Sequence, residues 1–122
     1  MIEKILNSDQ YFKEKTLKTQ IVVHHTAGGG NAENVIHGWN FNSERIGTAF
    51  LIDNKGEVFK AFEPEFWAYH LGLKTADNVK LNKGSIGIEV CNWGQLIKKG
   101  NEFYNYVNKV VPENEVVQIK KF

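Results

Sequence analysis

The chain has 122 residues, of which 42% are hydrophobic, and a formal net charge of +1. This length predicts one domain, residues 1–122, with a single core. The near-neutral charge argues against a nucleic-acid partner, and no apolar run is long enough to span a membrane. Because Cys91 is the only cysteine, an internal disulfide and a cysteine-only zinc site are excluded.

The N-terminal third of the chain predicts a lead-in, a strand and a helix. Residues 1–20 are polar, lack the apolar stretch of a secretory signal, and leave room for a short amphipathic helix. The β-branched run 21–23 predicts a strand covered on both faces. It leads into a histidine pair and ends at three glycines, residues 28–30. A capping asparagine and apolar residues at helical spacing predict a helix from Asn31 to about Phe41.

The rest of the chain predicts further strands around a long loop. Thr48–Asp53 and Glu57–Phe62 flank a short turn and indicate a β-hairpin. Residues 63–84 lack apolar periodicity and are interpreted as a functional loop. Ser85–Val90 alternates in the manner of a strand. Two weaker strands, separated by a turn at 112–115, are predicted at 103–107 and 116–119.

The pair His24-His25 stands at the end of the first predicted strand. Consecutive strand residues point to opposite faces, so only one of the two addresses a given site. Neutral imidazole is the commonest protein ligand of zinc, which makes a metal site one interpretation. The other is a polar strand end, with one ring bonded to backbone and one exposed. The local residues leave both open.

Two further side chains have chemical potential. Glu89 is the single carboxylate in an otherwise apolar strand. In a cleft its pKa would rise and it could act as a general base, whereas at a sheet edge it would face solvent. His70 lies beside Trp67 and Tyr69, in an aromatic cluster that could stack on a sugar or cover the core. The residues alone do not decide between these alternatives.

Five segments, in order, resemble the zinc-dependent N-acetylmuramoyl-L-alanine amidases, which share their fold with peptidoglycan recognition proteins. These segments are Ile21–Ala27, Gly47–Asp53 followed by Gly56, Trp67–Gly72, Ser85–Glu89 and Cys91–Gly94. The resemblance implies an α/β fold, in which helices flank a mixed central β-sheet, and a groove for the glycan and stem peptide of peptidoglycan. It also implies hydrolysis of the amide between N-acetylmuramic acid and L-alanine.

The resemblance also assigns roles to individual residues. His24 matches the first zinc ligand of the family, and Glu89 matches its usual general base. Some members carry a tyrosine where this chain has Thr48, which places more weight on Glu89. The implied zinc would polarise the carbonyl and activate a water molecule. Three substrate-binding residues are implied: His70, Trp67 and Tyr69.

The other two zinc ligands of the family have no counterpart in this sequence. The family takes them, a histidine and then an aspartate or cysteine, from a segment well after the Ser85–Glu89 strand. No histidine follows His70, no aspartate follows Asp77, and Cys91 comes too early. The chain thus looks like the N-terminal part of an amidase domain, incomplete at its C-terminus. We expect a marginally stable or oligomeric molecule.

Three functions follow from these observations. The first is a peptidoglycan amidase, or the part of one that carries His24 and Glu89. The second is a non-catalytic module that binds peptidoglycan through residues such as Trp93. The third is a structural component of a phage or secretion machine that reuses the fold, since fold alone does not fix function.

Overall fold

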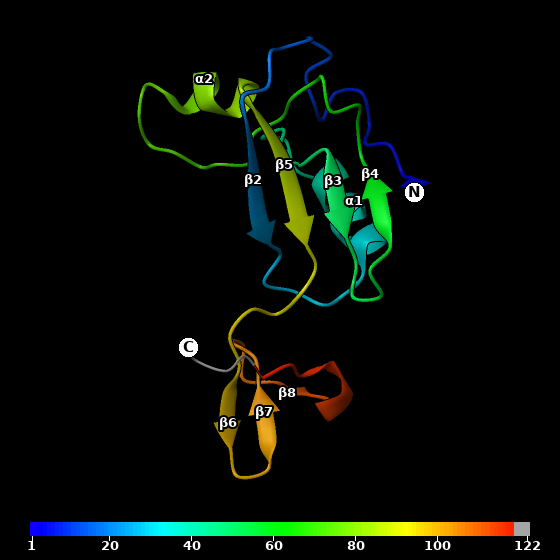
Figure 1. The fold of residues 1–122 in the computed structure, drawn as a ribbon, viewed down its shortest axis with the longest axis vertical. Helices are drawn as coiled ribbons and strands as arrows, with labels where there is room; N and C mark the ends of the chain where they lie inside the picture. Colours follow the sequence, from blue (N-terminus) through cyan, green and yellow to red (C-terminus); the bar gives the residue numbers. More distant parts are fainter. Residues whose placement is uncertain (119–122) are drawn as a thin grey trace.

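The computed structural model describes residues 1–118 and is built on a five-stranded mixed β-sheet (Figure 1). The strand order is β1-β4-β3-β5-β2. β3 and β4 pair antiparallel, and the other neighbouring strands pair parallel. The predicted fold class, an α/β fold with a mixed central sheet, is therefore confirmed. The strands are β1 (Ile2–Glu3), β2 (Gln20–His25), β3 (Phe50–Ile52), β4 (Val58–Lys60) and β5 (Ser85–Val90).

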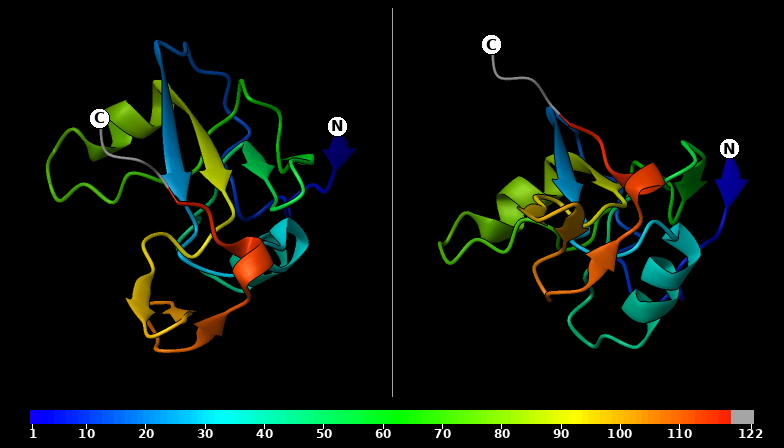
Figure 2. Two further views of the ribbon diagram at one scale, coloured as in Figure 1. Left: turned by 60° about the horizontal axis from the view of Figure 1, so that its bottom comes forward. Right: turned by 90° about the horizontal axis from the view of Figure 1, so that it is seen from below.

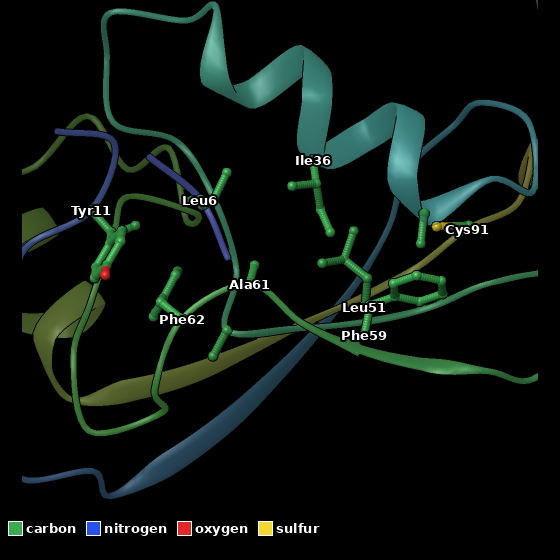
Figure 3. Close-up of a cluster of buried hydrophobic side chains, with 11 residues drawn as sticks. Leu6, Tyr11, Ile36, Leu51, Phe59, Ala61, Phe62 and Cys91 are labelled. Carbon is green, nitrogen blue, oxygen red and sulfur yellow. The ribbon is translucent and has the colours of Figure 1, made fainter. Parts of the chain in front are cut away.

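The helix α1 (Ala32–Asn40) covers one face of this sheet. It begins where the sequence predicts, because the Asn31 side chain accepts a hydrogen bond from the backbone N–H of Asn34. Ile36 of α1 packs over Leu51 and Phe59 of the central strands, and all three are at most 4% exposed (Figure 3). Burying a side chain of this size contributes about 1.5–3 kcal/mol, so this contact fixes the helix on the sheet.

A second, smaller sheet follows the main one in the chain. It comprises β6 (Ile97–Lys99), β7 (Glu102–Tyr104) and β8 (Val110–Val111), and a 3₁₀ turn follows at Glu113–Glu115. Figures 1 and 2 show it beyond the carboxyl ends of β2 and β5, whereas the helix α2 (Asn78–Lys83) lies at their amino ends. Within residues 1–118, no helix is long and apolar enough to cross a membrane.

Three expectations about the elements need correction. The lead-in contains no helix, because its backbone instead bonds to the sheet, as in the 2.8 Å contact from Leu6 N to the Ala61 carbonyl. The predicted loop at 63–84 contains α2, whose buried residue is the polar Asn82 and so leaves no apolar signal. The predicted strand at 116–119 is absent through Gln118, and its last residue lies outside the described part.

The strand β2 lies at the edge of the sheet with one face open. Ile21 and Val23 on that face are each 64% exposed. The expectation of a strand covered on both faces is therefore wrong. The physical reason is that β2 has one neighbouring strand, β5, and that α1 covers the opposite face of the sheet.

We expect this open face to promote self-association of the chain. The double substitution Ile21→Thr with Val23→Thr keeps β-propensity but removes exposed apolar surface. It should shift the protein toward monomer in sedimentation velocity, with a change in unfolding free energy within about 0.5 kcal/mol per site. Val117→Thr, at a residue that is 85% exposed and outside the sheets, is the matched control. A parent that stays monomeric at every concentration would contradict this expectation.

Candidate active site

His24 and Glu89 project from neighbouring strands toward the same side of the sheet. They are direct partners in the parallel pairing of β2 with β5, and partners side by side in a sheet point to one face. Leu51, the partner of Glu89 on β3, lies on that face beneath α1. His25 points to the opposite face, as the alternation of strand residues requires. The two residues that the resemblance singles out are thus brought to one side.

The Glu89 side chain is half-buried, with one carboxylate oxygen shielded from solvent. Its Oε2 atom has no hydrogen-bond partner among residues 1–118, and burial raises its pKa to about 7. A carboxyl group poised near neutral pH is suited to accept and return a proton. The structure places Glu89 on the sheet face that also carries the buried Leu51, so this carboxylate is not fully open to solvent.

A hydrogen-bonded chain runs from His24 to the start of β5. His24 Nε2 lies 2.9 Å from His70 Nδ1, and His70 Nε2 lies 2.9 Å from Ser85 Oγ. Burial lowers the pKa of His24. Burial, and then the charges of His24 and Lys18, lower the pKa of His70 to about 4. Both ring nitrogens of His70 are therefore engaged inside the protein, although the sequence predicts this residue as a substrate contact.

Asn82 of α2 holds the His70 segment in place. Its Oδ1 accepts hydrogen bonds from the backbone N–H groups of His70, at 2.8 Å, and Leu71, at 3.2 Å. Its Nδ2 donates to the Asn78 carbonyl at 2.7 Å, and the side chain is fully buried. Sequence reasoning missed Asn82 because one asparagine in a polar stretch carries no distinguishing signal.

Gly87 allows the His70 ring to lie against β5. It is two residues before Glu89 and therefore on the same face of the strand. A Cβ atom at this position would lie 2.7 Å from Thr48 Cγ2 and 3.1 Å from His70 Nδ1. A side chain here would push on both neighbours, so the close approach requires glycine.

Gly87→Ala should lower the free energy of unfolding by about 1–3 kcal/mol, the usual cost of overpacking. Thr48→Ser removes the nearest clashing atom and can retain the 2.8 Å bond from Oγ to the Phe50 carbonyl. The double variant should therefore recover part of the loss, as a positive coupling in a double-mutant cycle measured by chemical denaturation. If Gly87→Ala were as stable as the parent, Thr48 and His70 would lie farther from β5 than described.

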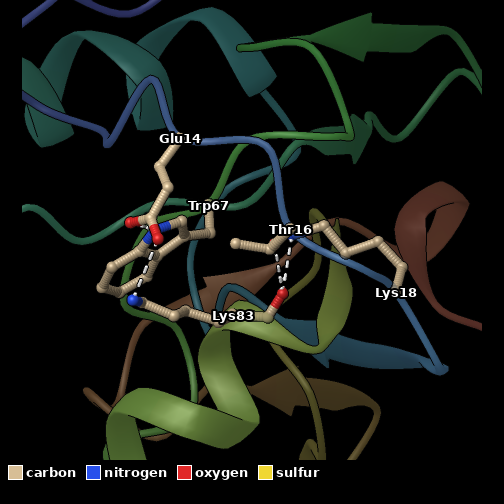
Figure 4. Close-up of polar contacts among 5 residues, drawn as sticks. All are labelled: Glu14, Thr16, Lys18, Trp67 and Lys83. Carbon is tan, nitrogen blue, oxygen red and sulfur yellow. Dashed lines mark hydrogen bonds and ion pairs between the residues drawn. The ribbon is translucent and has the colours of Figure 1, made fainter.

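Trp67 and Tyr69 pack together with Phe12 in an aromatic stack. Trp67 is 4% exposed, Phe12 stacks on it at 4.1 Å, and Lys83 lies 5.3 Å from its ring centre. Its Nε1 donates to Glu14, which also pairs with Lys83 (Figure 4). Tyr69 meets the Trp67 ring edge-on. Trp67 thus has little surface left for a substrate, and binding by either ring stays a prediction.

An open hollow lies at the carboxyl ends of β2 and β5. The loop that follows β5 packs on His25: Gly94 has φ +75°, and a Cβ there would lie 2.7 Å from that ring. Trp93 is in the same loop, and its ring lies 6.2 Å from that of Tyr106, which is 67% exposed. The hollow is lined by Val23, His24, His25, Val90 and Asn92.

The described residues do not complete a zinc site. Residues 1–118 contain no group of three histidine, cysteine, aspartate or glutamate side chains placed to hold a metal, whereas a catalytic zinc needs three protein ligands. Cys91 is buried, and burial together with the charges of Glu89 and Asp53 raises the pKa of its thiol to about 11. It is a packed, unreactive side chain in this fold.

Comparison with protein families assigns the chain to a class. The model of the N-acetylmuramoyl-L-alanine amidase family matches residues 15–117. Because this match spans most of the chain, the protein belongs to the N-acetylmuramoyl-L-alanine amidase family. A search of curated proteins gave no match.

Solved structures agree with this assignment at the level of the fold. The structure of PlyL has a TM-score of 0.62 at 20% identity, and the match covers 75% of this chain and 57% of that chain. The PlyG catalytic domain scores 0.59 at 20% identity, covering 74% and 54%. A mutant endolysin from Bacillus subtilis scores 0.58 at 22% identity, covering 74% and 59%. The chain therefore spans little more than half the length of these structures.

Proposed function

We propose that this site acts in the hydrolysis of peptidoglycan, at the amide between N-acetylmuramic acid and the first L-alanine of the stem peptide. The observation that carries the proposal is the pairing of His24 with Glu89 on one face, where Glu89 Oε2 is buried and without a partner. Membership of the amidase family supplies the reaction class. One of the similar structures is an endolysin from Bacillus subtilis, which agrees with a cell-wall substrate.

Glu89 is the proposed general base. Its carboxylate takes a proton from a water molecule while the water oxygen bonds to the amide carbon. The carbon–nitrogen bond then breaks as Glu89 returns the proton to the leaving nitrogen. The products are a muramic carboxylic acid and a peptide with a free N-terminal alanine. General acid–base catalysis of this kind contributes about 10²–10⁴-fold in rate.

His24 is proposed as the one zinc ligand that the described residues supply. A single imidazole does not hold zinc tightly, since structural and catalytic sites use three or four protein ligands. The 122-residue chain should therefore retain less than one zinc per chain after dialysis, measured by atomic absorption. Retention of one zinc per chain, undiminished by His24→Ala, would overturn the assignment of His24.

The proposed activity is tested on purified cell wall. With zinc added, a folded chain that also comprises any segment needed for zinc binding should release peptides that carry a new N-terminal alanine, detected by amine labelling and mass spectrometry. Glu89→Gln and His24→Ala should greatly reduce that release, and His37→Ala, on the exposed side of α1, should leave it unchanged. No release by a folded chain that also comprises any segment needed for zinc binding would end the catalytic proposal.

A binding module is the second candidate function, favoured by the lack of three metal ligands among residues 1–118. Trp93 and the exposed Tyr106 could then provide a platform for the glycan. Retention on insoluble cell wall should fall in Trp93→Ala and Tyr106→Ala, but not in Phe41→Ala, a 79% exposed ring outside the small sheet. Equal retention of all three variants would count against this function.

A further inference from the structure

A carbonyl group near the end of α2 fixes the position of the Ser85 hydroxyl proton, beside the site. The last carbonyl groups of a helix lack partners within the helix. Ser85 Oγ lies 2.8 Å from the Leu81 carbonyl and donates to it. A serine hydroxyl carries a single proton, and this contact uses it. Ser85 Oγ must therefore accept, rather than donate, in its 2.9 Å contact with His70 Nε2.

This proton determines the tautomers of both histidines. A neutral imidazole carries one N–H, so a proton on His70 Nε2 leaves His70 Nδ1 as an acceptor. His24 Nε2, 2.9 Å away, must then carry the proton of its own ring. If His70 carried its proton on Nδ1 instead, Ser85 would have to donate its one proton to His70 Nε2. The contact between Ser85 Oγ and the Leu81 carbonyl would then have no proton. One arrangement alone satisfies all three contacts.

We propose that His70 is a positioning residue, which holds His24 in the tautomer with its proton on Nε2 and leaves Nδ1 free to bind a ligand. Histidines that bind ligands through one nitrogen commonly donate the other N–H to a fixed acceptor. His70 is such an acceptor, because Asn82 clamps its backbone and Ser85 holds its far nitrogen. The short helix α2 thus orients His24 without touching a substrate.

The tautomer is measured directly by long-range ¹H–¹⁵N correlation spectra of the histidine rings, on the metal-free chain near neutral pH. His24 is expected to show a protonated Nε2 and an unprotonated Nδ1, and His70 the same pattern. A proton on His24 Nδ1 would overturn the proposal. No substrate or metal is present, so this outcome is independent of whether the protein hydrolyses peptidoglycan.

Two substitutions of His70 separate positioning from packing. His70→Phe keeps a ring at the 5.1 Å edge-to-face contact with His24 but removes the acceptor, so His24 should show a mixture of both tautomers. His70→Asn restores an acceptor oxygen near Nδ1 and should restore the single tautomer. His37→Asn is the control. An unchanged single tautomer in a folded His70→Phe would overturn the proposal, and if that variant does not fold, the spectra of the parent and His70→Asn decide.

Discussion

Glu89→Gln should make the folded protein more stable than the parent above about pH 7, and the difference should shrink as the pH falls. In the folded state burial raises the pKa of Glu89 to about 7 from an ordinary value of 4.5. The folded state therefore binds more protons than the unfolded state between these values, so the stability of the parent falls as the pH rises. Glutamine cannot ionise and avoids this loss.

Urea denaturation of both proteins from acid to alkaline pH measures this difference. Glu44→Gln, at an exposed residue, is the control and should follow the pH dependence of the parent. A pH-independent difference between Glu89→Gln and the parent would mean that Glu89 is not buried as described.

The same substitution should remove activity while it adds stability. If Glu89 moves the proton, release of stem peptides should fall about 10²–10⁴-fold in Glu89→Gln. Such a trade between stability and activity is expected where a charged group is buried for function rather than for folding. Full activity of the glutamine variant would remove Glu89 from the reaction.

Leu51→Ala should lower the free energy of unfolding by about 2–5 kcal/mol, through lost burial and the cavity left behind. Leu51 of β3 is fully buried beneath α1, and it pairs with Phe59 of β4 on one side and with Glu89 of β5 on the other. Because domains of this size are stable by about 5–15 kcal/mol, this loss is a large share of the total.

The measurement is the midpoint and slope of chemical denaturation for Leu51→Ala. Leu17→Ala is the matched control, since Leu17 is 84% exposed and should cost less than about 0.5 kcal/mol. If both variants unfolded at the same denaturant concentration as the parent, the core would not be centred on Leu51.

The regular elements were predictable where one residue pattern dominates. Asn31 predicts the start of α1 through its capping side chain. The alternation of Ser85–Val90 predicts β5, and the two runs around Gly56 predict the hairpin of β3 and β4. These patterns are local, so they can be recognised without knowledge of the tertiary contacts.

The surroundings of the site were not predictable in the same way. The alternation of residues along β5 places Glu89 on one face of the strand and Ile86 and Ile88 on the other. It does not indicate which of these two faces α1 covers. The structure covers the Glu89 face, and the apolar side chains Ile21 and Val23 of β2 remain exposed. Which face is buried depends on contacts between elements distant in sequence, and no periodicity records them.

The series of hydrogen bonds from α2 through Ser85 and His70 to His24 also could not be predicted from the sequence. Ser85, His70 and His24 are far apart in the chain, and their contacts depend on the parallel pairing of β2 with β5. The resemblance to the amidases pointed to His24 and Glu89 as a pair. It gave no sign that His70 uses both ring nitrogens within the protein.

Nuclear Overhauser effects between side chains would report whether His24 and Glu89 share one face of the sheet, on which the proposed site depends. We expect cross-peaks from the His24 side chain to the Glu89 Cγ protons and to the His70 ring. Cross-peaks from His24 to the Ile88 methyl groups instead, with none to Glu89, would place the two on opposite faces and contradict the proposed site.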